Sequence, residues 1–213
     1  MKRTTVTIAT LITPLLLLAS AHASESWKQV SSEQGIETFV RTAERSAISE
    51  LKAVIVIDAG LESITQVLRD VDAYPQWMPR CKKVRLIRKF DDHNRIVHIV
   101  LRFPFPTSDR DLVVKAATTF DPSGTRAVVS LELVNESIPI ARGIVRMTEF
   151  SGEYVLESLS GNRTLVSYRN KVNPGGYIPT SMVNLFSQEI IRDSLRGLRA
   201  MTIKNKYVAA APR

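Results

Sequence analysis

The sequence predicts an α+β protein in which a curved antiparallel sheet wraps around one long C-terminal helix. Between residues 81 and 172, successive short stretches alternate apolar and polar side chains, as half-buried strands do. Gly175 and Gly176 then end the strand pattern, and an amphipathic segment runs from Pro179 to about Tyr207. A sheet that grips a single helix around a cavity favours the binding of an apolar small molecule over chemistry.

The N-terminus has the pattern of a secretory signal peptide. Lys2 and Arg3 precede an apolar run over residues 6–18, and residues 21–23 match the small-x-small cleavage pattern. An uncleaved N-terminal anchor is the alternative, but the run is short for a membrane span. We therefore predict a signal peptide over residues 1–23 that is cleaved after Ala23, one domain over residues 24–208, and a short tail over residues 209–213.

We expect the mature chain to be a soluble monomer in a bacterial periplasm. Cys81 is the only cysteine, so no intramolecular disulfide can form and no lipid-attachment cysteine follows Ala23. The formal charge of +8 falls to +6 once Lys2 and Arg3 are removed (8 − 2). Basic residues are dispersed and carry no nucleic-acid-binding motif, which excludes nucleic acid as a predicted partner. The charge reflects a solvated surface, or it attracts anionic lipid head groups.

The N-terminal part of the domain is predicted to form a hairpin and a short helix. Residues 35–42 and 49–58 alternate apolar and polar side chains, and residues 43–46 suit the turn between them. Gly60 ends the second strand. Apolar residues from Leu61 to Val71 then recur at helical spacing, and the helix must stop before Pro75.

The rest of the sheet is predicted as a meander whose connections are too short for helical crossovers, so its strands should be antiparallel. Turn signals lie at residues 91–94, 104–106, 121–124 and 161–162. The predicted strands are residues 81–90, 95–103, 110–120, 126–134, 143–150, 154–159 and 164–172.

Strand alternation predicts which side chains face inward. His98 and Arg102 should face outward, opposite the apolar residues of the same strand. On the final helix, Ser187, Gln188 and Arg192 should lie opposite the apolar stripe. The predicted inward side chains are Val84, Leu86, Val97, Ile99, Leu101, Phe103, Ala127, Val129, Leu131, Leu133, Thr164, Val166, Tyr168, Asn170, Val172, Met182, Val183, Phe186, Ile190 and Leu198.

Three local patterns occur in order along this framework. Residues 74–84 (YPQWMPRCKKV) leave a helix and enter a strand, residues 108–113 (SDRDLV) open a later strand, and residues 176–184 (GYIPTSMVN) open the last helix. Together they resemble the START (StAR-related lipid transfer) family of lipid-transfer domains, within the helix-grip or Bet v 1-like superfamily, over residues 27–207. The resemblance implies a hydrophobic tunnel that holds one lipid-like molecule. Gln76 replaces an acidic residue frequent in the eukaryotic carriers, which argues against their charged head-group or sterol-hydroxyl mechanism here.

We predict that the ligand contacts come from inward apolar residues and a few polar ones. Burial of an alkyl chain gives about 0.8 kcal/mol for each CH₂ group, which can drive such binding. The residues of the Phe103–Pro106 turn are candidates for a gate that contacts a membrane transiently, although a rigid turn explains them equally well. The predicted ligand-binding residues are Leu86, Val97, Ile99, Leu101, Phe103, Leu131, Val166, Tyr168, Met182, Phe186, Glu189 and Ile190.

Two polar features leave alternatives open. Arg110 and Asp111 are neighbours in a strand, so they cannot both line a pocket, and an organising role at the turn is favoured over ligand binding. Glu189 either binds a polar head group or pairs with basic side chains at the surface.

Catalysis has little support in the sequence, and we expect a binding protein without a cofactor or metal. His93 and His98 are the only histidines after the signal peptide, and no metal-ligand spacing or nucleophile motif is present. Cys81 fits a buried, inert thiol. The alternative is a cyclase-like or hydrolase-like enzyme of the same superfamily that uses Tyr168, Asn170 and Glu189. A ligand sensor that signals to another envelope protein is a third possibility.

Overall fold

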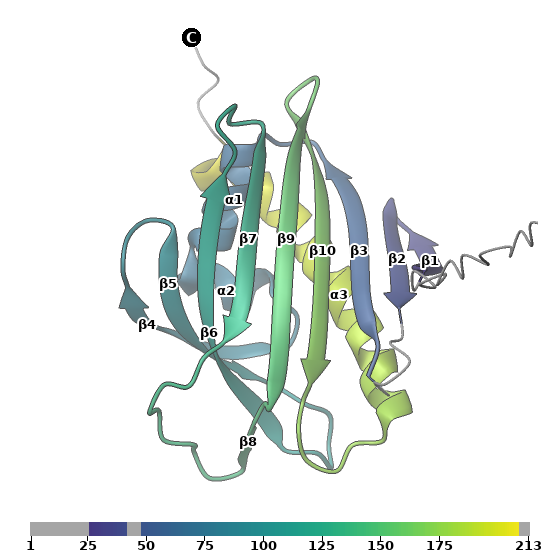
Figure 1. Cartoon of the computed structure of the whole chain (residues 1–213), viewed down its shortest axis with the longest axis vertical. Helices are drawn as coiled ribbons and strands as arrows, with labels where there is room; N and C mark the ends of the chain where they lie inside the picture. The colour runs from purple at the N-terminus through teal and green to yellow at the C-terminus, as the bar shows by residue number, and fades with distance from the viewer. Residues whose placement is uncertain (1–25, 42–47, 209–213) are drawn as a thin grey trace, which may run out of the picture.

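The computed structural model describes residues 26–41 and 48–208. A strongly curved ten-stranded sheet has the order β1-β2-β3-β10-β9-β7-β6-β5-β4, and β8 pairs with β6 beside this path (Figure 1). The strands are β1 (Lys28–Glu33), β2 (Ile36–Arg41), β3 (Glu50–Ile57), β4 (Cys81–Lys89), β5 (Asn94–Leu101), β6 (Asp109–Phe120), β7 (Arg126–Leu133), β8 (Ile144–Arg146), β9 (Glu149–Leu159) and β10 (Arg163–Asn173).

The long C-terminal helix, α3 (Thr180–Thr202), crosses the concave face of the sheet behind β3 and β10 (Figure 1). Its buried side chains recur at helical spacing, so one face of the helix packs on the sheet. Two shorter helices, α1 (Leu61–Arg69) and α2 (Tyr74–Trp77), contact α3 and cover the rest of the concave face beside a 3₁₀ turn (Val71–Ala73). The predicted α+β class with a curved sheet around the last helix is confirmed.

The sequence pattern failed at three elements. β1 was not predicted, because most of its side chains are exposed and it therefore lacks apolar alternation. Residues 149–159 form one strand rather than parts of two, since β9 pairs with β10 continuously past Gly152. The wholly antiparallel order is also wrong, because β8 lies parallel to the start of β6. The connection over residues 134–143 returns the chain to the start of β6, where β8 pairs with it.

β4 carries a further correction, at Leu86. The prediction that Leu86 faces inward is wrong: its side chain is 45% exposed. Register shifts between Cys81 and Lys83 and between Leu86 and Arg88 each add one residue to the strand. Each such bulge reverses the alternation of faces, so Cys81, Val84 and Ile87 are partly buried at a spacing of three.

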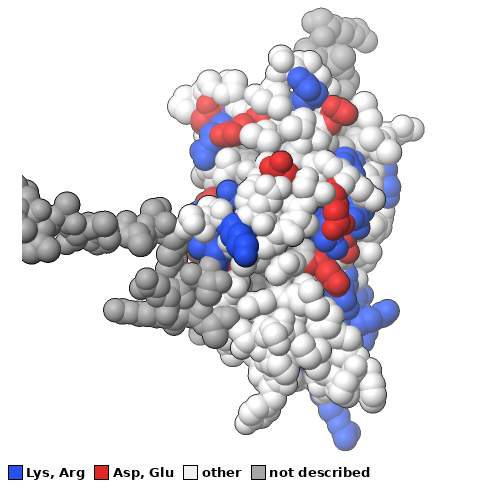
Figure 2. Space-filling model, turned by 90° about the vertical axis from the view of Figure 1, so that its right-hand side faces the viewer, with Lys and Arg blue, Asp and Glu red and all other residues white. Residues whose placement is uncertain are grey.

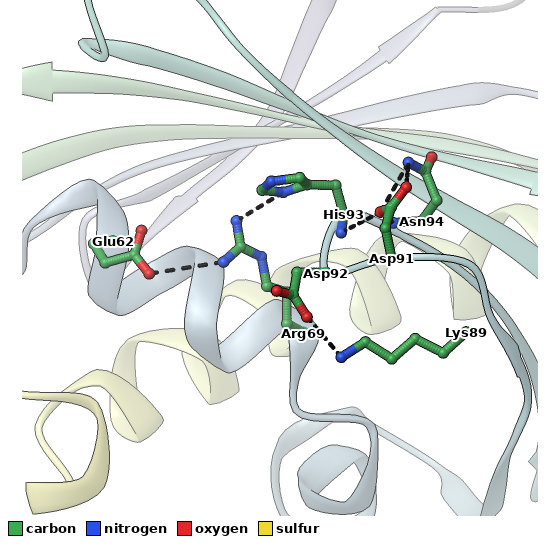
Figure 3. Close-up of polar contacts among 7 residues, drawn as sticks. All are labelled: Glu62, Arg69, Lys89, Asp91, Asp92, His93 and Asn94. Atoms are coloured by element: carbon green, nitrogen blue, oxygen red, sulfur yellow. Dashed lines mark hydrogen bonds and ion pairs between the residues drawn. The ribbon is translucent and has the colours of Figure 1, made fainter.

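Polar contacts join the end of α1 to the β4–β5 turn (Figure 3). Asp91 accepts hydrogen bonds from the backbone N–H groups of His93 (2.6 Å) and Asn94 (2.7 Å), which fixes the turn. Arg69 at the end of α1 reaches the Nδ1 atom of His93 (3.3 Å) and lies 3.7 Å from a carboxylate oxygen of Glu62. These contacts hold α1 over the end of the sheet at which β5 begins, and His93 lies in a turn as predicted.

A 3₁₀ turn after α3 (Asn205–Tyr207) is anchored to the end of α1. Asp70 accepts hydrogen bonds from the Tyr207 hydroxyl (2.6 Å) and from Lys206 Nζ (2.7 Å). We expect Tyr207→Phe to lower the free energy of unfolding by about 1 kcal/mol, because it removes one hydrogen bond to a carboxylate while the buried ring remains. Urea denaturation measures this change. Lys206→Met should change stability less, and an equal loss in both variants would contradict the assignment.

Candidate ligand-binding cavity

A cavity lies between the concave face of the sheet, α3, and the segment from α1 to the start of β4. The space not occupied by atoms is about 1160 Å³, its solvent-open part included. Apolar side chains from β5, β6, β7, β9 and β10 form one wall, and Val183, Phe186 and Ile190 of α3 form the opposite wall. Trp77, Met78 and the adjoining proline close a third side. A mostly apolar wall of this extent suits a hydrophobic ligand.

The structure places eight of the twelve predicted ligand-binding residues on the cavity wall: Val97, Ile99, Leu101, Phe103, Leu131, Tyr168, Phe186 and Ile190. The other four lie elsewhere. Leu86 is exposed on β4, Val166 is fully buried within the core cluster, and Met182 is 41% exposed at the start of α3. Glu189 is half-buried on α3 and does not line the cavity.

The α3 stripe also differs from its prediction at Ser187, which lines the cavity although the helical pattern placed it on the opposite face. Ser194, about two turns further along the helix, lines the cavity as well. The cavity-facing stripe is therefore wider than the apolar residues alone indicate. A serine on this face went unnoticed because its polarity was taken as a sign of solvent exposure.

Sequence reasoning missed two polar residues of the wall, Arg95 and Tyr154. Arg95 lies two residues before Val97 on β5, so the same alternation that placed Val97 inward also places Arg95 inward. Tyr154 is the direct cross-strand partner of Tyr168. Only the pairing register of β9 and β10 shows that the Tyr154 side chain faces inward.

Tyr154 and Tyr168 form a stacked pair inside the cavity, with ring centroids 4.0 Å apart and an interplanar angle of 4°. Burial raises the pKa of both phenols, so both carry their protons throughout the physiological range. Asn170 Nδ2 donates to the Tyr168 hydroxyl at 3.3 Å, whereas Asn170 Oδ1 is buried without a hydrogen-bond partner. The pair offers neutral polar groups and no charge.

Arg95 is the charged residue of the cavity wall and is only 5% exposed. Its Nη2 atom donates to the Leu68 carbonyl oxygen at 2.6 Å, and the Tyr74 hydroxyl donates to the same oxygen at 2.8 Å. Arg95 Nε has no hydrogen-bond partner, and no ion pair joins Arg95 to a carboxylate in the described part of the chain.

Arg110 lies at the start of β6, opposite the last residue of β5. Its side chain joins two loops that border the cavity, residues 102–108 and 174–179. Its Nε and Nη2 atoms donate to the carbonyl oxygens of Pro174 (3.2 Å) and Gly175 (3.1 Å), and Nη1 donates to that of Ser108. The guanidinium also lies 4.8 Å from the centre of the Phe103 ring. We call this region the loop end of the cavity. Arg110 therefore organises the turn, the alternative that the sequence favoured.

Asp111 points to the opposite, convex face of the sheet, as strand alternation requires. It is 1% exposed and accepts two hydrogen bonds from Arg146 of β8 (2.8 and 2.9 Å). His98 Nε2 lies 2.8 Å from Asp111 Oδ2, the oxygen that also accepts from Arg146 Nη2, which places His98 on the predicted outer face. Burial alone would raise the pKa of Asp111, but the bonds to Arg146 and His98 outweigh it and hold that pKa below its usual value.

The described residues contain no group of three or more side chains that could hold a metal ion. Burial raises the pKa of the Cys81 thiol to about 11, so this cysteine remains protonated and is a poor nucleophile. No Asp or Glu lines the cavity in the described part of the chain. None of the described helices combines the length and apolarity needed to cross a bilayer.

Comparisons with known proteins agree with this geometry. The START domain family model matches residues 13–206. An uncharacterised protein of Pseudomonas aeruginosa is 25% identical over 181 residues, which cover 85% of this chain and 89% of that protein. The phosphatidylcholine transfer protein of Mus musculus is 24% identical over 178 residues, 81% of each chain.

Solved structures give the same result. A STAR-related lipid transfer protein from Xanthomonas axonopodis superposes with a TM-score of 0.77 at 27% identity, and the match covers 84% of this chain and 99% of that chain. Human STARD10 shares the fold, with a TM-score of 0.76 at 18% identity over 87% of this chain and 76% of that chain. The curved sheet, the gripped helix and the matched sequence together show that this chain belongs to the START domain family, which is known for lipid binding and transfer.

Proposed function

We propose that this chain binds a single lipid, or another hydrophobic molecule, in the cavity between the sheet and α3, and carries it between membranes. The observation that carries the proposal is the cavity itself, whose wall between the sheet and α3 is formed mostly by apolar side chains. A wall this apolar suits a ligand with a hydrocarbon chain better than a polar metabolite. The lipid-transfer relatives support the same reading.

Loading would occur where the loop end meets a membrane. Phe105 (96% exposed) and Tyr177 (106%) project from the two loops that Arg110 joins, and Leu185 of α3 is 58% exposed. Figure 2 shows that the lower end of the molecule is mostly uncharged, with basic side chains at its lowest edge. Apolar side chains with a basic margin favour transient contact with an anionic lipid surface. Separation of the two loops there would let the ligand exchange without crossing water.

The proposed site of action is the periplasm, with the protein acting as a monomer. The signal peptide over residues 1–23 and the tail over residues 209–213, on which the domain prediction rests, lie outside the described residues. Cell fractionation followed by N-terminal sequencing tests the location and the cleavage after Ala23. Recovery of the intact N-terminus in the membrane fraction would instead support an anchor.

Native mass spectrometry of the exported protein, followed by organic extraction, is the direct test of binding. We expect a bound lipid-like molecule at one copy per chain. Ile190→Trp should lower its occupancy at least tenfold, because an indole in the cavity occupies the space of the ligand. Ile203→Trp is the matched control, since Ile203 is 74% exposed and outside the cavity. A protein that stays empty after incubation with an envelope lipid extract would contradict the proposal.

A second candidate is a periplasmic enzyme of the same superfamily that acts on a small hydrophobic substrate. The unpartnered Asn170 Oδ1 beside the Tyr168 hydroxyl favours it, because both are polar groups in an apolar cavity. Glu189 does not face them, which removes the carboxylate that this alternative needed. Substrate turnover that is lost in Tyr168→Phe would establish the enzyme, whereas stoichiometric lipid without turnover favours the carrier.

A further inference from the structure

The two ends of the cavity differ in chemistry. Arg95 lies near the start of β5 and Leu101 at its end, on the same face and about 20 Å apart along six strand steps, and Phe103 follows in the adjoining loop. At the loop end, the side chains that line the cavity near Phe103 are apolar. The Arg110 guanidinium there does not line the cavity and donates to three backbone carbonyl oxygens. The Arg95 end lies against the last turn of α1 and holds a buried cation. A molecule that fills the cavity therefore meets an apolar environment at one end and a positive charge at the other.

Among the residues that the structure describes, no carboxylate pairs with the charge of Arg95. The Leu68 carbonyl, near the C-terminus of α1, supplies a partial negative charge and one hydrogen bond at 2.6 Å. That single carbonyl leaves Nε unpaired, although the residue is 95% buried (5% exposed). A buried guanidinium without an anionic partner is costly, and buried charges in folded proteins are normally paired.

A second hydrogen-bond donor on this wall is also unpaired. Trp77 Nε1 is buried without a partner, and the Trp77 ring contacts the Tyr74 ring edge-on at a centroid distance of 5.6 Å. Tyr74 shares the Leu68 carbonyl oxygen with Arg95, so the three side chains belong to one end of the cavity. Both unpaired atoms are N–H groups. They can be satisfied by acceptor oxygens and not by further donors.

We propose that the Arg95 end binds the anionic head group of the ligand, a carboxylate or a phosphate ester, while the hydrocarbon chain extends toward the loop end. This inference rests on the proposed function and specifies its ligand class. A guanidinium pairs with planar carboxylates and with phosphates through charge-assisted hydrogen bonds, and a dry, low-dielectric site strengthens that pairing. A neutral head group would leave the buried charge uncompensated.

Three ligands with the same alkyl chain test the proposal: hexadecanoate, hexadecyl phosphate and 1-hexadecanol. Binding to the delipidated mature protein is measured at pH 8 by displacement of a fluorescent fatty-acid probe. We expect one or both anions to bind about 10- to 100-fold more tightly than the alcohol. Preference for hexadecanoate would indicate a fatty acid as the natural class, and preference for hexadecyl phosphate would indicate a phospholipid.

Arg95→Met is the decisive variant, because methionine keeps the apolar stem and removes the charge. Its affinity for the anions should fall to that for the alcohol, while its affinity for the alcohol stays unchanged. Arg85→Met is the matched control, since Arg85 is exposed on β4 and lies outside the cavity. Should Arg95→Met fail to fold, Arg95→Lys, which retains the charge, should keep the anion preference.

The outcomes separate the two proposals. Equal affinity of the native protein for the anions and the alcohol would overturn the Arg95 site but leave the lipid-binding function intact. An anion preference that persists in Arg95→Met would overturn it too, because the cation would then lie elsewhere. Failure of all three ligands and of a total envelope lipid extract to bind would overturn the proposed function itself.

Discussion

Replacing Gly197 by alanine is expected to lower the free energy of unfolding by about 2–3 kcal/mol. Gly197 lies within α3 where the helix meets α2, and an added Cβ would lie 2.2 Å from the Trp77 carbonyl oxygen. Because that neighbour is backbone, α3 and α2 must move apart to relieve the clash. The movement disturbs packing on both sides, including the part of the cavity wall formed by Trp77 and Ser194.

The sign of this effect makes the test specific. Glycine to alanine inside a helix ordinarily stabilises a protein by about 0.5–1 kcal/mol, because glycine loses more backbone entropy on folding. We expect the midpoint of thermal unfolding to fall instead, by about 5–10 °C for a domain of this size. Ala200→Gly, at an exposed position three residues later, is the control for helix propensity and should cost about 1 kcal/mol. Stabilisation by Gly197→Ala would show that the two backbones are not in close contact.

Asp111→Asn is expected to destabilise the protein at neutral pH by about 3 kcal/mol. Asp111 is the buried anion that joins β5, β6 and β8, and its loss leaves Arg146 without a counter-charge. The Arg146 side chain is 24% exposed, so water offsets part of the cost, and the figure lies at the low end for broken buried pairs. Arg146 also donates to the Ile138 carbonyl, so the segment over residues 134–143 should loosen first.

The dependence on pH follows from the lowered pKa of Asp111. A group whose pKa is lower in the folded than in the unfolded state stabilises the fold fully above its unfolded pKa, here 3.8. That contribution is lost as the pH falls from 3.8 through the folded pKa. The stability difference between native protein and Asp111→Asn should therefore be largest near pH 7 and shrink below pH 4. Urea titrations at pH 7 and pH 3 measure it.

An exposed pair supplies the control for Asp111. Asp92 lies 2.6 Å from Lys89, but its side chain is 79% exposed. Asp92→Asn should leave stability unchanged within error, since exposed ion pairs contribute little. If both aspartate variants lost the same stability at pH 7, net charge rather than the buried contact would explain the result.

The elements of the fold could be predicted where one side of each was buried. The strands from β5 to β7 and helix α3 carry clear two-residue or helical periodicity, because one face packs on the core and the other meets solvent. β1 lacked this contrast and was missed. Bulges in β4 reversed the alternation without leaving a mark in the sequence, and Leu86 was placed on the wrong face as a result.

The candidate site was predictable to the extent that wall and core share the same apolar pattern. An inward apolar side chain either packs in the core or borders the cavity. The cavity wall includes Val97, Ile99, Leu101 and Phe186. The pattern cannot say which of the two applies. Val166 was expected at the ligand and lies instead in the packed core.

The sequence by itself determined the α+β class, the long final helix and the apolar character of the interior, because these depend on local periodicity and composition. Tertiary structure alone decided what the charged residues do. Arg95 and Asp111 are both ordinary charged residues in predicted strands. Arg95 is buried on the cavity wall with no counter-charge among the described residues, whereas Asp111 is paired with Arg146 and His98 on the convex face. Pairing between charges depends on contacts between distant segments, such as Asp111 with Arg146, and no local pattern encodes such contacts.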